Sequence, residues 1–341
     1  MPLPLWHPES LAGRLPFLRR RTALTVATRA HFTAHGYTEV ETPCLVPVPG
    51  MEVHLHAFRS EFSPHLGAGT RRTLWLRTSP ELALKRLLVA GAGPVFELAR
   101  VWRNGEVSPR HAPEFTMLEL YRPGLGFTGM MDEAEAYVRA VCPTIVAHQG
   151  VVCDLSLPFQ RLTMADAFMR HCNGLDILAT EGDSARLHAA ANAAGLPPRA
   201  DEAWEDLFFR LLLERVEPHL GRGQATFLTH WPTPQAALAR LDPADPRAAL
   251  RFELFVAGLE LANAFDELTD AAEQRARFSK DVAERRRLHG AEGWDVDEDF
   301  LAALEHGMPA GSGIALGFDR LAMLASGARG IEDVQWLPFA P

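Results

Sequence analysis

The sequence lacks the paired cysteines of a metal ribbon or a redox motif. Its four cysteines are scattered, and no two are separated by just two residues: Cys44, Cys142, Cys153 and Cys172. This spacing argues against a zinc ribbon or a thioredoxin-type site. No apolar run reaches the roughly 20 residues of a membrane span, and no basic region followed by an apolar stretch opens the chain, as in a signal peptide. These absences predict a protein of the reducing cytoplasm.

The chain also has a shortage of positive charge. Its formal net charge is −9 over 341 residues, and an acidic chain is poorly suited to nonspecific wrapping of nucleic acid. The arginine runs at 19–21 and 285–287 could form a local basic patch, although solvated helix faces more often explain such runs. With 47% apolar and 23% charged residues, the composition is that of an ordinary globular protein with a substantial core.

The common nucleotide-binding signatures are missing as well. The chain has no Walker A sequence, and it has neither the glycine-rich first turn nor the regular strand–helix alternation of a Rossmann fold. Any ATP site must therefore be of another kind.

Hydrophobic spacing predicts an α+β fold, an antiparallel sheet flanked by helices. Four prolines in residues 1–16 predict an extended arm, and Gly36 is placed to end the helix that follows it. Ser79 is a candidate N-cap, with Pro80 as the first helical residue. The other predicted helices are 125–145, 164–171, 185–194, 204–216, 271–288 and 319–325. The predicted strands are 38–42, 75–77, 95–102, 114–122, 252–256, 259–264 and 311–317, with a loop at 103–112 and a break at 229–234.

The predicted strand 114–122 places four side chains on one face. Alternate residues of a strand share a face, so Phe115, Met117, Glu119 and Tyr121 line up. An aromatic ring, a carboxylate and a phenol suit a bound base and a bound ammonium group. Arg103, at the end of the preceding strand, could make two hydrogen bonds to a phosphate. A core strand with one salt-bridged glutamate is an equally good explanation of the same residues.

Acidic residues also interrupt the apolar strands around 252–264. Carboxylates in such positions are costly unless they are paired or hold a cation. Glu253 and Glu260 could bind Mg²⁺, and Glu267 could accept a substrate ammonium group. Glu260 and Glu267 lie on opposite faces of a regular strand, so a bulge or turn must intervene if both face one site. The alternative is an exposed acidic edge.

The glycine-rich strand 311–317 has small residues on one face, Gly313, Ala315 and Gly317. These leave room for a ligand to approach the backbone. Arg320 follows in the first turn of a helix, where its charge is locally unfavourable and a bound anion would offset it. A tightly packed strand–helix turn without a ligand would explain the same residues equally well.

In this order, the segments 103–121, 252–270 and 311–321 resemble motifs 2 and 3 of the class II aminoacyl-tRNA synthetases. Residues 36–43 resemble motif 1, which forms the dimer interface of that class. Residues 78–81, 110–116 and 260–265 resemble the lysine branch. The resemblance implies a class II synthetase-like antiparallel sheet flanked by helices. It divides the chain into an N-terminal extension, 1–18, and a catalytic domain, 19–341, with a helical insertion at about 160–225.

The motif 1 helix begins near residue 20, which leaves no room for the anticodon-binding barrel of lysyl-tRNA synthetases. The chain therefore resembles a stand-alone family of lysyl-tRNA synthetase-like ligases, as residues 87–96 and 307–309 also do. This family activates (R)-β-lysine or lysine with ATP and transfers it to a lysine of elongation factor P. Ala315 stands where lysyl-tRNA synthetases have glycine, a plausible source of the preference for β-lysine. The resemblance implies a homodimer formed through motif 1 and no membrane partner, and the missing barrel and the net acidity argue against tRNA as a partner.

The resemblance also assigns roles residue by residue. It implies Mg²⁺ at Glu253 and Glu260, and catalytic roles for Arg103, Arg320 and Glu260. The implied contacts to the amino acid are Ser79, Pro80, Glu81, Glu119, Tyr121, Asn263, Glu267 and Ala315. The implied contacts to ATP are Arg103, Asn104, Gly105, Glu106, His111, Ala112, Phe115, Glu260, Leu261, Gly317 and Arg320.

The chain departs from the family pattern at three positions. Gly105 stands where many relatives have glutamate, Ala112 where they have asparagine, and Ala264 replaces a glycine. These departures concern mainly the contacts of the 103–112 loop with ATP. Two other functions remain open, a truncated enzyme that charges tRNA and a regulatory paralogue that binds ligand without catalysis.

Overall fold

The structure is a computed structural model that describes residues 3–65, 69, 71–290 and 293–339. The chain forms two compact units. The first unit comprises Met1–Leu125 and Leu268–Pro341, and the second unit comprises Gly126–Glu267. Within the described residues no helix is both long enough and apolar enough to cross a membrane.

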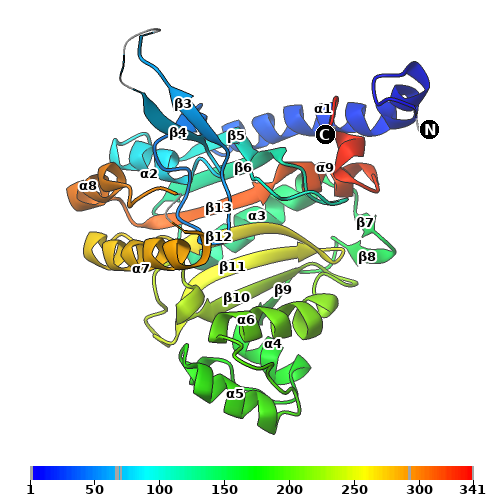
Figure 1. Cartoon of the computed structure of the whole chain (residues 1–341). Coiled ribbons are helices and arrows are strands. Elements are labelled where there is room, and N and C mark those ends of the chain that lie inside the picture. Colours follow the sequence, from blue (N-terminus) through cyan, green and yellow to red (C-terminus); the bar gives the residue numbers. More distant parts are fainter. Residues whose placement is uncertain (1–2, 66–68, 70, 291–292, 340–341) are drawn as a thin grey trace. The chain divides into compact units, whose positions relative to one another are not determined.

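The first unit contains a four-stranded sheet in the order β1-β5-β6-β13 (Figure 1). Strand β1 pairs with β5 in parallel, and the other two pairings are antiparallel. A separate three-stranded sheet has the order β2-β4-β3. The elements of this unit are α1 (Pro8–Ala34), β1 (Thr38–Glu39), β2 (Leu45–Val46), β3 (Arg59–Phe62), β4 (Arg72–Leu76), α2 (Glu81–Val89), β5 (Val95–Trp102), β6 (Glu114–Pro123), α7 (Ala271–His289), α8 (Glu298–Gly307), β13 (Gly311–Gly317) and α9 (Phe318–Ser326).

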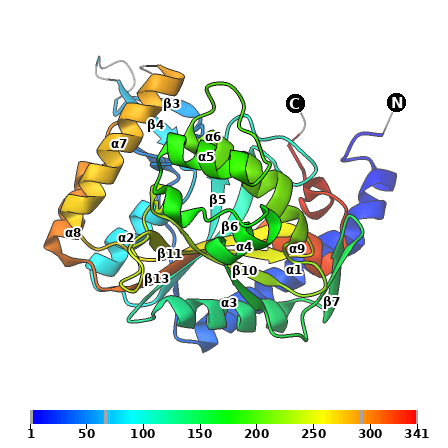
Figure 2. The same cartoon turned by 90° about the horizontal axis from the view of Figure 1, so that it is seen from below.

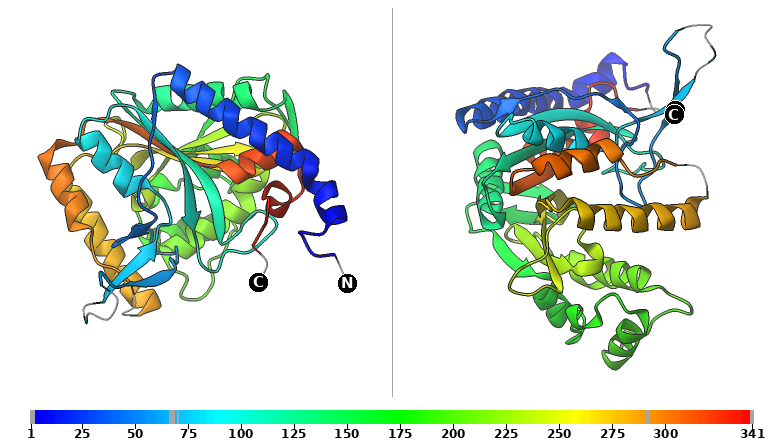
Figure 3. Two further views of the ribbon diagram at one scale, coloured as in Figure 1. Left: turned by 90° about the horizontal axis from the view of Figure 1, so that it is seen from above. Right: turned by 90° about the vertical axis from the view of Figure 1, so that its left-hand side faces the viewer.

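Helices pack beside this sheet in pairs. Helix α1 lies against α9, as Figure 3 shows, and α2 packs against both α8 and β6. The predicted strands 95–102 and 311–317 are confirmed with the same bounds, and the other predicted elements of this unit are found within a few residues. Strand β3 and helix α8 were not predicted from the sequence.

The predicted extended arm is wrong, because α1 already begins at Pro8. Proline is tolerated in the first turn of a helix, where its missing N–H would have no partner in any case. The His7 ring accepts a hydrogen bond from the Glu9 N–H and caps the helix. The buried Arg14 then ties the helix to the C-terminal segment by donating to the carbonyl oxygens of Glu332 and Gln335 at 3.0 and 2.8 Å. These remote contacts outweigh the local preference of the prolines.

The end of α1 follows the prediction. His35 is the C-cap, and Gly36 follows it with a φ of +83°. This left-handed conformation favours glycine, and it is the usual way in which a helix ends.

In the second unit four strands are hydrogen-bonded in the order β9-β10-β11-β12. Strand β9 is parallel to β10, and the remaining pairs are antiparallel. A β7–β8 hairpin stands apart from this sheet. The elements of this unit are α3 (Phe127–Val141), β7 (Ile145–His148), β8 (Val151–Asp154), β9 (Gln160–Thr163), α4 (Met164–His171), α5 (Ser184–Ala193), α6 (Trp204–Leu211) continued by a π-helical turn (Leu212–Val216), β10 (Thr226–Pro232), β11 (Ala248–Val256) and β12 (Leu259–Asp266).

The helices of the second unit enclose an aromatic core. Phe208 stacks on Phe168 and on Trp204, with ring centroids 5.6 and 5.0 Å apart. Figure 2 shows α4, α5 and α6 of this unit, and helix α4 packs against β9 and β10. The predicted helices of this region are confirmed within a few residues.

No α-helix continues into the expected break at 229–234, but most of this stretch is strand, because β10 runs from Thr226 to Pro232. Nearly all residues of β10 are buried, so the strand shows no alternation of polar and apolar residues from which it could be recognised. Strands β7, β8 and β9 were missed as well.

The two arginine runs do not form the basic patch considered above, nor are they simply solvated helix faces. Arg21 forms an ion pair with the buried Asp319, and Arg20 donates to the Ala325 carbonyl at 3.3 Å. Arg285 is likewise buried. Arg286 and Arg287 are exposed, but each pairs with an acidic residue, Asp295 or Glu284. Three of the six arginines, Arg21, Arg286 and Arg287, therefore pair with acidic residues within the first unit.

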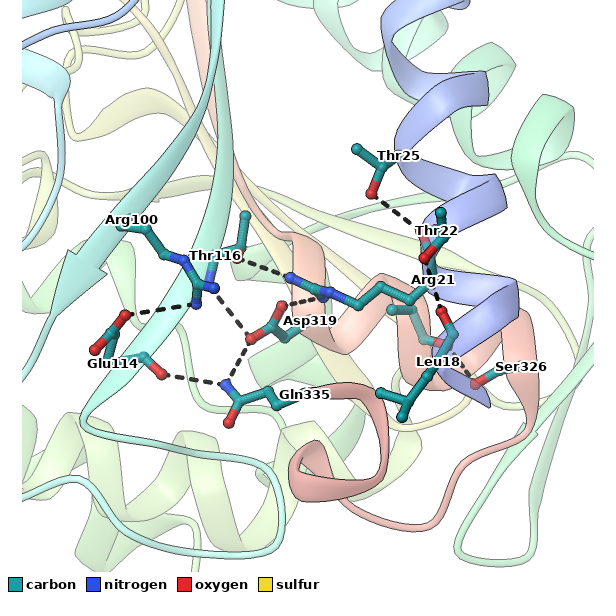
Figure 4. A network of polar contacts seen from close by, with 11 residues as sticks. Leu18, Arg21, Thr22, Thr25, Arg100, Glu114, Thr116, Asp319, Ser326 and Gln335 are labelled. Atoms are coloured by element: carbon teal, nitrogen blue, oxygen red, sulfur yellow. Dashed lines mark hydrogen bonds and ion pairs between the residues drawn. The ribbon is translucent and has the colours of Figure 1, made fainter. Parts of the chain in front are cut away.

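Asp319 is the centre of a polar network that joins α1, β6 and α9. Figure 4 shows the side chains of Arg21, Thr116 and Gln335 around it. Its carboxylate accepts hydrogen bonds from Arg21, from the Thr116 N–H at 3.3 Å and from the Gln335 amide at 2.8 Å. Only 1% of Asp319 is exposed, so this carboxylate depends entirely on these donors for its stabilisation.

We expect Asp319→Ala to lower the free energy of unfolding by about 3–5 kcal/mol, because it leaves the Arg21 charge buried without its partner. The matched control is Arg71→Ala. The Arg71–Glu61 pair is 71% and 60% exposed, so its loss should cost no more than about 1 kcal/mol. Urea unfolding of both variants measures the difference, and equal losses would contradict the central role of Asp319.

Candidate active site

The register of the first unit's sheet assembles the face predicted from β6. Phe115, Met117, Glu119 and Tyr121 alternate along the strand, and β13 adds small residues beside them. Ala315 pairs directly with Glu119, and Gly317 pairs with Met117. Because directly opposed residues of antiparallel strands share a face, Ala315 places its single methyl group next to the Glu119 row.

Glu119 is buried and fully engaged in hydrogen bonds. The Ser79 and Tyr121 hydroxyls each donate to one of its carboxylate oxygens at 2.6 Å. Helix α2 begins at Glu81 with Pro80 as the N-cap, so the predicted helix start lies one residue too early. Ser79 Oγ nevertheless accepts a hydrogen bond from the Glu81 N–H at 3.0 Å. The same hydroxyl therefore connects the start of α2 to Glu119.

Lys85 also belongs to this group, although it was not identified from the sequence. Its Nζ donates to Glu81 Oε1 at 2.6 Å and lies 5.7 Å from the centroid of the Tyr121 ring. Only 1% of Lys85 is exposed. Two signals could have indicated it. It lies four residues after Glu81 on a helix, and the chain contains only one other lysine, Lys280.

The environment of Glu119 raises the pKa of its carboxyl group to about 8. Burial is the largest cause, and the nearby Glu81 charge adds to it. The hydrogen bonds from Ser79 and Tyr121 and the charge of Lys85 act in the opposite direction. A carboxyl group in this state gains stability when a further cation arrives, as a substrate ammonium group would provide.

Arg103 lies beside the aromatic end of the same face. Its guanidinium carbon is 5.2 Å from the centroid of the Phe115 ring, and its backbone N–H donates to the Pro113 carbonyl at 2.9 Å. Its Nε is buried and has no hydrogen-bond partner among the described residues. Because an unpartnered buried donor is costly, this nitrogen is suited to an anionic ligand.

The start of the loop between β5 and β6 has a defined conformation. The Asn104 N–H donates to the His56 carbonyl at 2.7 Å, and Gly105 has a φ of +85°. A glutamate at position 105 would be strained in this conformation. Glu106 is half-buried, and Ala112 is buried. Glycine at position 105 therefore suits the left-handed backbone conformation of this residue.

His111 connects this loop to the helix that follows β13. Its Nε2 contacts Arg320 Nη2 at 2.7 Å, and its Nδ1 contacts Ser108 Oγ at 2.7 Å. Since the guanidinium can only donate, Nε2 is the acceptor and Nδ1 carries the hydrogen. A Cβ on Gly317 would lie 3.3 Å from Arg320 Cδ, so the stem of Arg320 passes close over this glycine. The structure thus brings His111, Gly317 and Arg320 together.

In the second unit, β11 and β12 form a polar group of their own. Arg251 pairs with Glu253 at 2.8 Å and donates to Asn263 Oδ1 at 3.1 Å. The register of the two strands shifts at one point, where Leu254 pairs with Ala262 but Phe255 pairs with Glu260. Leu261 is therefore the extra residue of a bulge.

This bulge removes the parity difficulty seen in the sequence. It moves Glu260 onto the face of β12 that carries Asn263, and the Glu260 charge acts on Glu253 from there. Glu267, just after the strand, has the same parity as Asn263 and is 2% exposed. Apart from Glu260, which is partly exposed, this acidic group is buried rather than an exposed edge.

Glu253 has a pKa raised to about 8, mainly by burial and then by the Glu260 charge, against the lowering effect of Arg251. In the described part of the chain no group of three or more His, Cys, Asp or Glu side chains could hold a metal ion. A divalent cation at Glu253 and Glu260 would therefore need further ligands from water or from a bound phosphate, which is the usual manner of Mg²⁺ binding.

Comparison with known proteins identifies the relatives of the chain. The family model for tRNA synthetases class II (D, K and N) matches residues 14–340. The elongation factor P–(R)-β-lysine ligase of Klebsiella pneumoniae (strain 342) is 41% identical over 333 residues, covering 96% of each chain. The protein of the same name from Salmonella typhi is 40% identical over the same coverage.

We expect the raised pKa of Glu119 to affect stability. Between about pH 4.5 and 8 the folded protein keeps a proton that the unfolded chain has lost, so the free energy of unfolding falls as the pH rises through this range. Glu119→Gln cannot titrate and should show a flatter dependence. Denaturant unfolding from pH 5 to 8.5 tests this, and parallel curves for the two proteins would count against it.

Proposed function

The chain belongs to the class II tRNA synthetase family (D, K and N), and from this premise we propose that it is an ATP-dependent, AMP-forming ligase. It activates (R)-β-lysine or lysine as an aminoacyl-adenylate and transfers it to a lysine side chain of elongation factor P. The names of its relatives support both the amino acid and the acceptor. We further propose that it works in the cytoplasm, as a homodimer formed through residues 36–43.

One observation carries the proposal. Arg103 has a buried Nε without a hydrogen-bond partner among the described residues, and its guanidinium lies over the Phe115 ring. Strand β6, which carries Phe115, also carries the buried Glu119 four residues after it, about 13 Å along an extended chain. An anion site next to an aromatic ring and a carboxyl site farther along one face suit a nucleotide joined to an amino acid with an ammonium group.

We assign the remaining roles along the same lines. Phe115 stacks on adenine, Arg103 binds the α-phosphate and Arg320 binds another part of ATP. Asn104, Gly105, Glu106, His111, Ala112, Leu261 and Gly317 complete the ATP contacts. The amino acid is bound by Ser79, Pro80, Glu81, Glu119, Tyr121, Asn263 and Glu267. The position of Ala315 opposite Glu119 supports its proposed part in the preference for β-lysine.

The residues at Glu253 and Glu260 fit a magnesium ion. Their charges repel each other in a buried setting, and a divalent cation would relieve this repulsion. When bound, Mg²⁺ supplies positive charge that neutralises phosphate oxygens. We assign Arg251 the task of holding Glu253 in place, because it pairs with this carboxylate and with Asn263.

Catalysis in this scheme depends on position and charge. A carboxylate oxygen of the amino acid attacks the α-phosphorus of ATP in line, and the bond to pyrophosphate breaks. Arg103 and Arg320 orient the groups and stabilise the charge that develops. The neutral amine of the acceptor lysine then attacks the carbonyl carbon, the amide bond forms, a proton is lost and AMP leaves.

Two other functions can be separated from this one. A truncated enzyme that charges tRNA would use the same first step, but the net charge of −9 makes tRNA a poor partner. A regulatory paralogue without catalysis would not need Arg103, Glu260 and Arg320, and all three are present.

We expect Arg103→Ala to reduce ATP–pyrophosphate exchange by at least about 10²–10³-fold, because it removes a charged donor from the reacting phosphate. Arg100→Ala is the matched control. Arg100 lies in the adjoining strand, is 52% exposed and, among the described residues, its side chain forms only a long ion pair of 3.7 Å with Glu114, so exchange should be unchanged. An Arg103→Ala protein that exchanges normally would rule out the assigned role.

The acceptor is tested by supplying labelled lysine or (R)-β-lysine together with ATP, elongation factor P and tRNA in one reaction. We expect the label on elongation factor P, with a mass increase of one lysyl group, and none on tRNA. Replacement of the acceptor lysine of elongation factor P by arginine should abolish the labelling. Labelled tRNA would support the truncated synthetase instead.

A further inference from the structure

Glu52 lies in the segment between β2 and β3, outside any helix or strand. Two residues of the first unit fix its backbone. Arg285 donates to the carbonyl oxygens of Glu52 and of Leu55, the latter at 3.1 Å. Trp294, whose ring lies 4.0 Å from the Arg285 guanidinium, donates to the Gly50 carbonyl at 2.5 Å. The segment is therefore held in a defined position.

The Glu52 side chain turns back over Gly50. A Cβ on Gly50 would lie 2.5 Å from Glu52 Oε2 and 2.6 Å from Thr78 Oγ1. The carboxylate thus occupies the space that a side chain at position 50 would need. Thr78 directly precedes Ser79, whose hydroxyl binds Glu119, so Glu52 lies close to the group of residues assigned to the amino acid.

Glu52 has an unsatisfied carboxylate oxygen. Its Oε2 is buried and has no hydrogen-bond partner in the part of the chain that the structure describes. Burial and then the Glu81 charge raise the pKa of this carboxyl group, and the backbone N–H of Glu52 itself and the charges of Arg103 and Arg285 offset the rise only in part. Arg285 donates hydrogen bonds to backbone carbonyl oxygens, and the Arg103 guanidinium lies over the Phe115 ring.

The three carboxyl groups of this region differ in the hydrogen bonds and ion pairs that they already form. Both oxygens of Glu119 already accept hydrogen bonds from Ser79 and Tyr121. Glu81 forms an ion pair with Lys85 at 2.6 Å. A lysine-type substrate brings two ammonium groups, and each is costly to remove from water without a counter-charge. Glu52 retains an oxygen available for one of them.

The charged neighbours of Glu52 favour one of the two ammonium groups. Its charge interacts with Arg103 as well as with Glu81. Arg103 is assigned to the α-phosphate, where the substrate carboxylate reacts. The amino group near that carboxylate is at the α-carbon in lysine and at the β-carbon in β-lysine, whereas the other amino group is at the far end of the side chain in both.

We propose that Glu52 binds the amino group nearest the reacting carboxylate and thereby helps to distinguish β-lysine from lysine. This inference rests on the proposed activation of a lysine-type amino acid. It makes Glu52 a specificity-determining residue in addition to those assigned above.

The test compares lysine, (R)-β-lysine and 6-aminohexanoate, which lacks the near amino group of either isomer and keeps the far one. Binding to the whole protein is measured by isothermal titration calorimetry, and turnover by ATP–pyrophosphate exchange. Glu52→Gln should weaken binding of the better diamino acid by about 10- to 100-fold, the size of a lost charge-assisted hydrogen bond. Binding of 6-aminohexanoate should change less than about threefold, and the KM for ATP should stay constant.

Two further variants complete the experiment. Glu52→Asp keeps the charge on a shorter side chain, so it should bind diamino acids better than Glu52→Gln and alter the ratio between the two isomers. Glu61→Gln removes an exposed glutamate of β3 and should change nothing. Thermal unfolding of all the variants detects any general loss of folding.

Each outcome bears on one of the two proposals. Equal weakening of all three ligands would assign Glu52 to the far amino group, a selective rise in the KM for ATP would assign it to the nucleotide, and no change in any ligand would make it structural. Each of these overturns the inference. A wild-type protein that binds the diamino acids without pyrophosphate exchange would refute the proposed reaction but leave the inference about Glu52 intact.

Discussion

The antiparallel register of β6 with β5 and β13 is the constraint on which the first unit's site depends. It aligns Glu119 with Ala315 on one side and with Glu97 on the other. Since side chains alternate along a strand, a slip of one residue would turn Phe115, Glu119 and Tyr121 to the opposite face. The same register fixes where Arg103 leaves the sheet. The ring, the carboxyl group and the arginine are thus placed by backbone pairing, before any contact between their side chains.

Both units contain carboxyl groups in positions that oppose ionisation. Burial raises the pKa values of Glu119, Glu253 and Glu52, and in each case a neighbouring acidic residue adds to the rise. Such groups reduce the stability of the folded protein above their ordinary pKa. They are preorganised for cations, since each would regain its favoured charged state when an ammonium group or a metal ion arrives. These carboxyl groups therefore lower the stability of the folded protein and at the same time favour the binding of positive charge.

Arginine and lysine have different tasks in this protein. Arg14 and Arg285 each bind several carbonyl oxygens and connect segments far apart in the chain. The planar guanidinium, with its five donors, suits such connections. Lys85 instead places a compact charge against Glu81 beneath the Tyr121 ring. The sequence contains only two lysines. In the buried position of Lys85, the compact ammonium group suits the contact with Glu81 better than the larger guanidinium of an arginine would.

The sequence by itself determined the strands of the site and the faces they present, because a period of two residues places Phe115, Glu119 and Tyr121 together wherever the strand lies. It also determined that Glu260 and Glu267 require a bulge between them, but the register of β11 with β12 decided that the bulge is at Leu261. Only the tertiary structure decided the helical start of the chain and the position of Glu52 over Gly50. These features depend on contacts with remote residues, such as Gln335 for Arg14 and Arg285 for Glu52, and no local pattern records them.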